Sequence, residues 1–212
     1  MKIKSLIFLA AIAFCSFAHA DDYYWIGGAG EWNDASHWSK NSGGAVAGSI
    51  PGSTDNVIFD DSSLSEDFSL IHLSDNVTIQ NLKINANHFA SFYGSGINLT
   101  IKGNFDLKSK AGFYLGGEIR FDNESAATQF INTNGIDFYT DLAFIDGSWS
   151  LNDHLKTGKA YSIHFRSGTF VSNGNTVHGK NIFVNQEPYR LDFTDSHISV
   201  LEKFDIANGV NI

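Results

Sequence analysis

Short segments in which apolar and polar residues alternate follow one another over most of the chain. Val77 and Ile79 alternate with polar neighbours, and Leu82 and Ile84 then do so in a shifted phase. Alternation with period two places one set of side chains on one face of a β-strand, and a change of phase indicates that the chain turns a corner. The pattern returns in further copies that begin at Leu99, Ile119, Leu142, Ile163, Ile182 and Ile198.

The length of this repeat predicts how the strands are arranged. The copies begin 22, 20, 23, 21, 19 and 16 residues apart. A corner inside a copy of about 20 residues is typical of one rung, or one circuit of the chain, in a parallel β-helix, where stacked rungs share a continuous core. Gly103, Gly147 and Gly168 fall at the corners, where residues that tolerate a positive φ are useful. The sequence therefore predicts an all-β fold, a β-solenoid of about six to seven rungs.

Two residue types support this interpretation. Phenylalanines that stacked rungs would align occupy inward phases, namely Phe105, Phe121, Phe144, Phe165, Phe193 and Phe204. Asparagines, whose side chains hydrogen-bond turn backbone, lie at or near the expected turns, namely Asn81, Asn104, Asn132, Asn134, Asn152, Asn173 and Asn175. The alternative is an antiparallel sandwich, which also has short strands between turns. It leaves the repeat length unexplained.

The first 20 residues have the three parts of a secretory signal peptide. Lys2 and Lys4 precede the apolar run 6–14, and Ala18 and Ala20 stand at the two positions that a signal peptidase recognises. We therefore predict that residues 1–20 are cleaved. The apolar stretch is too short to span a bilayer as a helix, and no second one follows, so we expect no membrane insertion after cleavage.

Charge and cysteine content narrow the functional classes. The whole chain has a formal net charge of −9, and loss of Lys2 and Lys4 with the signal makes it −11. Nucleic acids bind positive surfaces, from which they release counterions, so we expect no nucleic-acid partner. Cys15, the only cysteine, lies within the signal, so the exported chain has no disulfide and depends on its core for stability.

The most specific local motif lies in residues 25–60. Residues 25–32 are WIGGAGEW and residues 33–39 are NDASHWS; SGG follows at 42–44, Pro51 comes next, and DNVIFD occupies 55–60. This resembles the N-terminal β-solenoid region of large secreted or surface proteins of gliding and environmental Gram-negative bacteria. Those proteins begin, after a signal, with W-x-G-G-x-G-x-W-x-D-x-x-x-W-S, then S-G-G, a proline and D-x-V-x-F-D. Residues 147–153 and 167–174 also resemble rungs of that family.

The resemblance implies a right-handed parallel β-helix that is exported to the cell surface or beyond, with the periplasm as the alternative. It implies a structural or adhesive role, with a surface polysaccharide or a downstream domain of a longer protein as partner. We expect residues 21–60 to form a Trp/Gly-rich N-terminal cap. Residues 61–212 would form the solenoid, incomplete at its C-terminus, since no sorting domain of the kind that ends longer members occurs in this range.

The aromatic residues of the motif have two interpretations. In the first, the three tryptophans plug the open first rung, and the glycines let the backbone fold over it. In the second, exposed aromatic rings form a platform for sugar rings, because aromatic faces stack on apolar ring surfaces. The residues concerned are Trp25, Trp32, Trp38, Tyr23 and Tyr24.

Candidate metal chemistry is restricted to calcium. Hard cations take carboxylate oxygens, and acidic residues occur at expected turns near the motif. The candidate ligands are Asp34, Asp55, Asp60 and Asp61. We expect no other cofactor, because the histidines after the signal are scattered and none has the close spacing of a zinc site.

An enzyme is the remaining class, because the parallel β-helix also occurs in polysaccharide-degrading enzymes and a fold does not define a function. A glycosidase needs two carboxylates about 5–10 Å apart. Adjacent residues such as Asp60 and Asp61 point to opposite faces of a strand and do not face each other. We therefore predict a noncatalytic secreted β-solenoid that acts as a structural or adhesive segment at the bacterial cell surface. The alternative is an extracellular carbohydrate-binding module or a β-helix polysaccharide-degrading enzyme.

Overall fold

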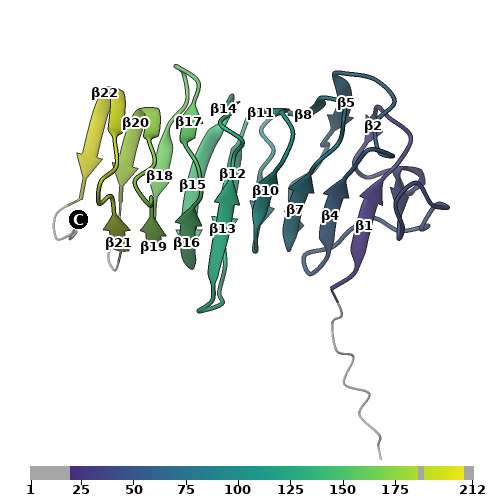
Figure 1. Cartoon of the computed structure of the whole chain (residues 1–212), viewed down its shortest axis with the longest axis horizontal. Helices are drawn as coiled ribbons and strands as arrows, with labels where there is room; N and C mark the ends of the chain where they lie inside the picture. The colour runs from purple at the N-terminus through teal and green to yellow at the C-terminus, as the bar shows by residue number, and fades with distance from the viewer. Residues whose placement is uncertain (1–19, 186–188, 208–212) are drawn as a thin grey trace, which may run out of the picture.

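A computed structural model describes residues 20–185 and 189–207, and it confirms the predicted all-β solenoid. Strands stack side by side along the long axis of the molecule, from β1 near the N-terminus to β22 (Figure 1). The signal peptide predicted for residues 1–20 lies outside the described residues except for Ala20. In the described ranges, the one helix is the 3-10 helix η1 (Ala35–His37), and no helix is long and apolar enough to cross a bilayer.

Three sheets form the walls of the solenoid. Sheet A contains, in spatial order, β3 (Trp38–Ser39), β1 (Asp22–Trp25), β4 (Asn56–Phe59), β7 (Asn81–Ile84), β10 (Phe105–Leu107), β13 (Thr128–Asn132), β16 (Ser148–Leu151), β19 (Gly168–Val171) and β21 (Tyr189–Asp192). Sheet B contains β2 (Gly30–Glu31), β5 (Ser69–His72), β8 (Ala90–Gly94) and β11 (Ala111–Leu115). Sheet C contains β6 (Val77–Ile79), β9 (Leu99–Ile101), β12 (Glu118–Asp122), β15 (Asp141–Asp146), β18 (Ile163–Phe165), β20 (Val177–Val184), β17 (Leu155–Thr157) and β14 (Asp137–Phe138), and β22 (Ile198–Ile206) pairs with β20.

The direction of pairing rules out the antiparallel sandwich. Among the described strands, pairs within the three sheets are parallel except for β1 with β3, which is antiparallel. Strands β14 and β17 continue the line of β2, β5, β8 and β11 along one edge of the molecule (Figure 1). The wall begun by sheet B therefore extends over the following rungs and joins sheet C through the long strand β20.

The parallel register aligns apolar side chains of successive rungs in columns. Phe121 lies opposite Phe144, and Phe144 lies opposite Phe165. The three rings are fully buried and stacked, with centroids 4.9 and 5.0 Å apart. Phe105 is also buried, and Phe193 packs against the core. The predicted inward ladder of phenylalanines is confirmed at these positions.

Phe204 departs from that prediction. Its register partner Ile182 is fully buried, so its phase is the inward one, yet 43% of Phe204 is exposed. Strand β22 pairs with β20 on one side, and no described strand lies on its other side. A ring on the inward phase is buried only when rungs lie on both sides of it, which is why phase alone misplaces Phe204.

The corners between sheets are held by asparagine side chains and by glycine. The amide of Asn81 donates to the Asn56 side chain over 2.6 Å and accepts from the backbone N–H of Asn104 over 2.5 Å. At Gly147, φ is +98°, and a Cβ would lie 2.6 Å from the carbonyl oxygen of Asn123. Asn134 takes a positive φ of 52°. These features explain why asparagine and glycine recur at the corners, as the sequence predicts.

Candidate functional site

A row of exposed tyrosines follows the wall begun by sheet B. Tyr93 in β8 and Tyr114 in β11 are direct register partners. Tyr139 follows β14 on the next rung, and Tyr161 follows β17 on the rung after that. The exposed fractions of Tyr93, Tyr114 and Tyr139 are 48%, 41% and 42%. One outward tyrosine per rung contributes little to the core and leaves a line of aromatic surface in contact with solvent.

The rings hold fixed orientations because glycines make room for them. A Cβ at Gly112 would lie 2.6 Å from Cε2 of Tyr114, and a Cβ at Gly158 would lie 3.2 Å from Cδ1 of Tyr139. The rings of Tyr114 and Tyr139 stack, with centroids 5.3 Å apart and planes 13° apart. Tyr161 meets Tyr139 edge-on at 6.5 Å. The rings thus form a connected row, and a larger residue at either glycine would displace them.

The four tyrosines line an open hollow of about 270 Å³, which we call the tyrosine hollow. Gly94 and Gly116 also line it. Neither glycine tolerates a side chain, since a Cβ would lie 2.9 Å from the Leu73 carbonyl oxygen at Gly94 and 2.6 Å from the Gly96 nitrogen at Gly116. The result is an open recess lined by glycine residues and by tyrosines.

A second hollow, of about 350 Å³, shares Tyr114 and Tyr139 with the first, and we call it the lysine hollow. Lys110 and Lys156 line it, together with one carboxylate, Asp137. Among the described residues neither lysine forms an ion pair. Asp137 is the register partner of Lys156, so the hollow carries two ammonium groups against one carboxylate, a local positive charge in a chain with an excess of acidic residues.

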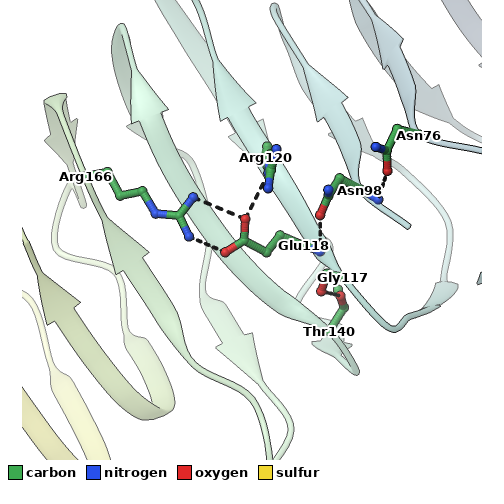
Figure 2. A network of polar contacts seen from close by, with 7 residues as sticks. All are labelled: Asn76, Asn98, Gly117, Glu118, Arg120, Thr140 and Arg166. Carbon is green, nitrogen blue, oxygen red and sulfur yellow. Dashed lines mark hydrogen bonds and ion pairs between the residues drawn. The ribbon is translucent and has the colours of Figure 1, made fainter. Parts of the chain in front are cut away.

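The outer face of sheet C instead carries charges that pair with each other (Figure 2). Glu118 on β12 accepts a hydrogen bond of 2.9 Å from Nε of Arg120, and the Arg166 guanidinium binds both of its carboxylate oxygens. The pair with Arg166 crosses the intervening strand β15, where Ala143, the register partner of Arg120, is fully buried. Bidentate binding of this kind fixes the positions of both groups.

Asparagine side chains extend this network along the solenoid. The Asn98 backbone N–H donates to the Asn76 side-chain oxygen over 2.8 Å, and the Glu118 backbone N–H donates to that of Asn98 over 3.0 Å (Figure 2). The Thr140 hydroxyl donates to the Gly117 carbonyl over 2.9 Å. Each bond links one rung to the next, so the network is a structural connection between rungs.

The titration of this face follows from its burial and pairing. Partial burial raises the pKa of Glu118, but the hydrogen bonds from Arg166 and Arg120 outweigh burial and hold the pKa below its ordinary value. Burial lowers the pKa of His164, which stacks on Phe183 with centroids 5.0 Å apart. Glu118 is therefore ionised and His164 neutral at pH 7.

A third hollow, of about 230 Å³, lies on the same face and is lined by acidic and basic groups. It contains Asp122, Glu124 and Lys102, with Thr78 and Thr100. Burial raises the pKa of Asp122, and the neighbouring carboxylates of Asp146 and Glu124 raise it further. A carboxyl group that keeps its proton more readily than usual, beside a second carboxylate, is a candidate proton donor.

The three tryptophans of the motif are buried and do not form the exposed platform that sugar binding would need. Trp25, Trp32 and Trp38 are fully buried and pack around Phe59 and one another, with Trp25 5.0 Å and Trp32 4.8 Å from Trp38. The indole N–H groups of Trp25 and Trp38 are also used, since Trp25 donates to the Gly28 carbonyl and Trp38 donates to the Trp32 carbonyl. The platform interpretation is therefore corrected for these residues, because no ring face remains free.

The two tyrosines of that prediction are also held by neighbours. Tyr23 is buried, its hydroxyl hydrogen-bonds Ser49 over 2.8 Å, and the Lys40 ammonium lies 3.3 Å from its ring centroid. Tyr24 is half-buried in β1.

Strands β1 and β4 belong to the continuous sheet A, so the sheet crosses the cap boundary that the sequence placed at residue 60.

The predicted calcium ligands are not brought together. Within residues 20–185 and 189–207, no group of three or more acidic, histidine or cysteine side chains has the placement of a metal site. Asp34, Asp55 and Asp60 accept hydrogen bonds from the nearby backbone N–H groups of Ser36, Gly52 and Ser62 respectively. Asp61 is exposed. The first three act as turn residues, and the bond from Ser36 lowers the pKa of Asp34.

The sequence analysis did not predict the tyrosine row, although the sequence contains a signal for it. Tyr93, Tyr114, Tyr139 and Tyr161 are 21, 25 and 22 residues apart, close to the length of one rung. Once a rung length is known, a residue type that recurs at that spacing on the polar phase marks a line along one wall.

Comparison of the chain with protein-family models, with curated proteins and with solved structures finds no match. The family resemblance of the tryptophan motif therefore stays a prediction. The case for a site rests on the geometry of the two hollows beside Tyr114 and Tyr139.

Proposed function

We propose that this chain is a noncatalytic, secreted β-solenoid that acts as an adhesive segment at the bacterial cell surface. The observation that carries the proposal is the line of outward tyrosines on a straight wall of stacked rungs. Stacked rungs give a stiff body with regularly spaced positions on each wall. Exposed aromatic surface arranged in a line marks a contact surface.

The outer face of sheet C supports this proposal, because it differs from the tyrosine row in having charges that are already paired. The charges of the sheet C network are paired with one another, so they offer few free groups to a partner. The acidic chain keeps the body soluble after export and repels other polyanions away from the tyrosine row. Export is supported by the sequence of residues 1–20 alone.

Two measurements test the proposal. The full chain, expressed in a Gram-negative host and fractionated, is expected outside the cytoplasm with its N-terminus at Asp21. Beads coated with the mature chain are expected to adhere to bacterial cells, and beads carrying Tyr114→Ala with Tyr139→Ala are expected to adhere less. Beads coated with Phe130→Ala are the matched control, because Phe130 is an exposed aromatic residue on sheet A. An uncleaved cytoplasmic product, or equal adhesion by all three bead types, contradicts the proposal.

The hollow around Asp122 favours a second function, a β-helix polysaccharide-degrading enzyme. Asp122 would donate a proton to the leaving oxygen, because its pKa is raised, and Glu124 would supply the second carboxylate. Release of reducing ends from polysaccharides by the mature chain, abolished by Asp122→Asn, would establish this function. If no polysaccharide tested is cleaved, the noncatalytic proposal stands alone.

A further inference from the structure

We infer that the tyrosine hollow and the lysine hollow together bind an acidic polysaccharide, a chain of sugars that carry carboxylate groups. This inference rests on the proposed adhesive function and supplies its ligand class. The two hollows share Tyr114 and Tyr139, so one extended ligand can contact both at once.

The aromatic part of the site fits sugar rings. The tyrosine hollow is open and is lined by four tyrosines and by two glycines. Aromatic faces pack on the apolar C–H faces of sugars, and tyrosine hydroxyls hydrogen-bond sugar hydroxyls. Tyr114 and Tyr139 stack on each other and Tyr93 stacks on His72, so one face of each ring is covered, and the ring surface that stays exposed and the hydroxyls offer the two contacts.

The spacing of the tyrosines fits a chain rather than a single sugar. Tyr93 and Tyr114 stand on paired strands, and Tyr139 and Tyr161 stand on the next two rungs. Paired strands lie about 4.8 Å apart, so the row runs along the solenoid axis over several rungs. A polymer lying along this axis contacts successive rings, and each added contact slows its dissociation.

The lysines favour a negatively charged ligand. Lys110 and Lys156 form no ion pair in the described part of the chain and lie beside Tyr114 and Tyr139, where one carboxylate, Asp137, is also present. Elsewhere the chain is strongly acidic, so a polyanion is attracted at this position and repelled around it. Two lysines are too few to hold nucleic acid, whose binding needs many phosphate contacts.

The test uses the mature chain and immobilised polygalacturonate, with dextran as the uncharged polymer. We expect the wild-type chain to bind polygalacturonate, to bind dextran at least about tenfold more weakly and to dissociate faster as NaCl is raised. Lys110→Ala with Lys156→Ala, and separately Tyr114→Ala, are each expected to weaken binding by about tenfold or more. The controls Lys83→Ala and Phe130→Ala change an exposed lysine and an exposed aromatic residue on sheet A and are expected to bind as wild type. Circular dichroism and urea unfolding would check that each variant is folded.

The other outcomes separate this inference from the function on which it rests. Equal binding to dextran, unaffected by the lysine variants, assigns the site to uncharged sugars and overturns the acidic ligand. Adhesion to cells without binding to any polysaccharide, especially adhesion that protease treatment of the cells removes, identifies a protein ligand and overturns the inference while the adhesive function stands. Absence of both adhesion and binding overturns both.

Discussion

The two walls of the solenoid that differ most are the tyrosine row beside sheet B and the Glu118 network on sheet C. Both are built on the same stacked rungs and on the outward phase of parallel strands. On sheet C, Glu118 binds Arg120 on its own strand and binds Arg166 across the intervening strand β15. Along the tyrosine row, ring surface, hydroxyls and two lysines stay open to solvent.

This difference separates groups that stabilise the protein from groups that are free to bind a ligand. A charge that already has its partners contributes to folding, and binding a ligand there would first have to break that pair. An exposed ring contributes less to folding than a buried one, and its exposed surface is free to contact another molecule. Unfolding free energies of variants on the two walls test whether stabilising groups and ligand-binding groups are separate.

Among changes to the outward side chains of the two walls, the largest effect is expected for Glu118→Ala. This change leaves two guanidinium groups without their carboxylate on a partly buried face, and we expect it to lower the free energy of unfolding by about 2 kcal/mol, between the values for exposed and buried pairs. Urea unfolding at pH 7 measures this effect. Glu202→Ala, which removes an exposed carboxylate 3.6 Å from Lys180, is the control, with an expected loss below about 0.5 kcal/mol. Equal losses in both variants would show that the Glu118 network does not stabilise the wall.

Acidification is expected to destabilise the sheet C wall by a smaller amount. The folded-state pKa of Glu118 lies below its ordinary value of 4.5, so the unfolded chain takes up the proton first. The stabilisation is fully present above pH 4.5 and is lost as the pH falls through the folded-state pKa. The pKa of His164, lowered from 6.5, acts in the same direction and begins to do so below pH 6.5.

Urea unfolding of wild type and Glu118→Gln over this pH range separates the two contributions. The glutamine variant cannot titrate at this position, so its loss of stability below pH 4.5 is expected to be smaller than that of wild type. Its loss between pH 6.5 and 4.5, which comes from His164, is expected to be retained. Parallel pH profiles for the two proteins at every pH would contradict the assignment to Glu118.

On the tyrosine row we expect a coupling between two rings of about 1 kcal/mol. Tyr114 and Tyr139 stack on each other, so a double-mutant cycle with alanine at each position should show an interaction energy of about 0.5–1.5 kcal/mol. Tyr114→Phe keeps the ring and is expected to unfold as wild type. A coupling of zero would mean that the two rings are placed independently.

The smallest effect on stability is expected for Tyr93→Ala. The exposed ring of Tyr93 stacks on His72, with centroids 6.0 Å apart, and we expect its removal to change the free energy of unfolding by no more than about 0.5 kcal/mol. The neighbouring Phe92→Ala removes a fully buried ring from the same strand and is expected to cost about 3–5 kcal/mol. A loss on Tyr93→Ala comparable to that of Phe92→Ala would show that the row is part of the core.

The sequence was sufficient to predict the inward face of each rung. Alternation places Phe121, Phe144 and Phe165 on one phase, and their spacing is close to the rung length, so their stacking follows from local patterns alone. The outward contacts could not be predicted in this way. Glu118 and Arg166 are 48 residues apart in the sequence and meet across strand β15. This meeting depends on the register of the stacked strands, which local patterns do not reveal.

The tryptophans show a different limit. A glycine-rich segment with three tryptophans has the composition of a binding platform as well as that of a buried plug. The antiparallel pairing of β1 with β3 sets Trp25 directly opposite Trp38 and turns both indoles into the core. Composition could not decide between the interpretations, because burial depends on how the segment folds back on itself.

The stacking of parallel rungs has a mechanical consequence. Hydrogen bonds between rungs run along the long axis, so a force that pulls the two ends apart along this axis opposes the bonds of one rung interface at a time. Each rung that detaches would release about 22 residues, or about 70 Å of extended chain. A tether made of this solenoid would thus lengthen in regular steps under load, and each step would dissipate energy before the attachment at its wall is broken.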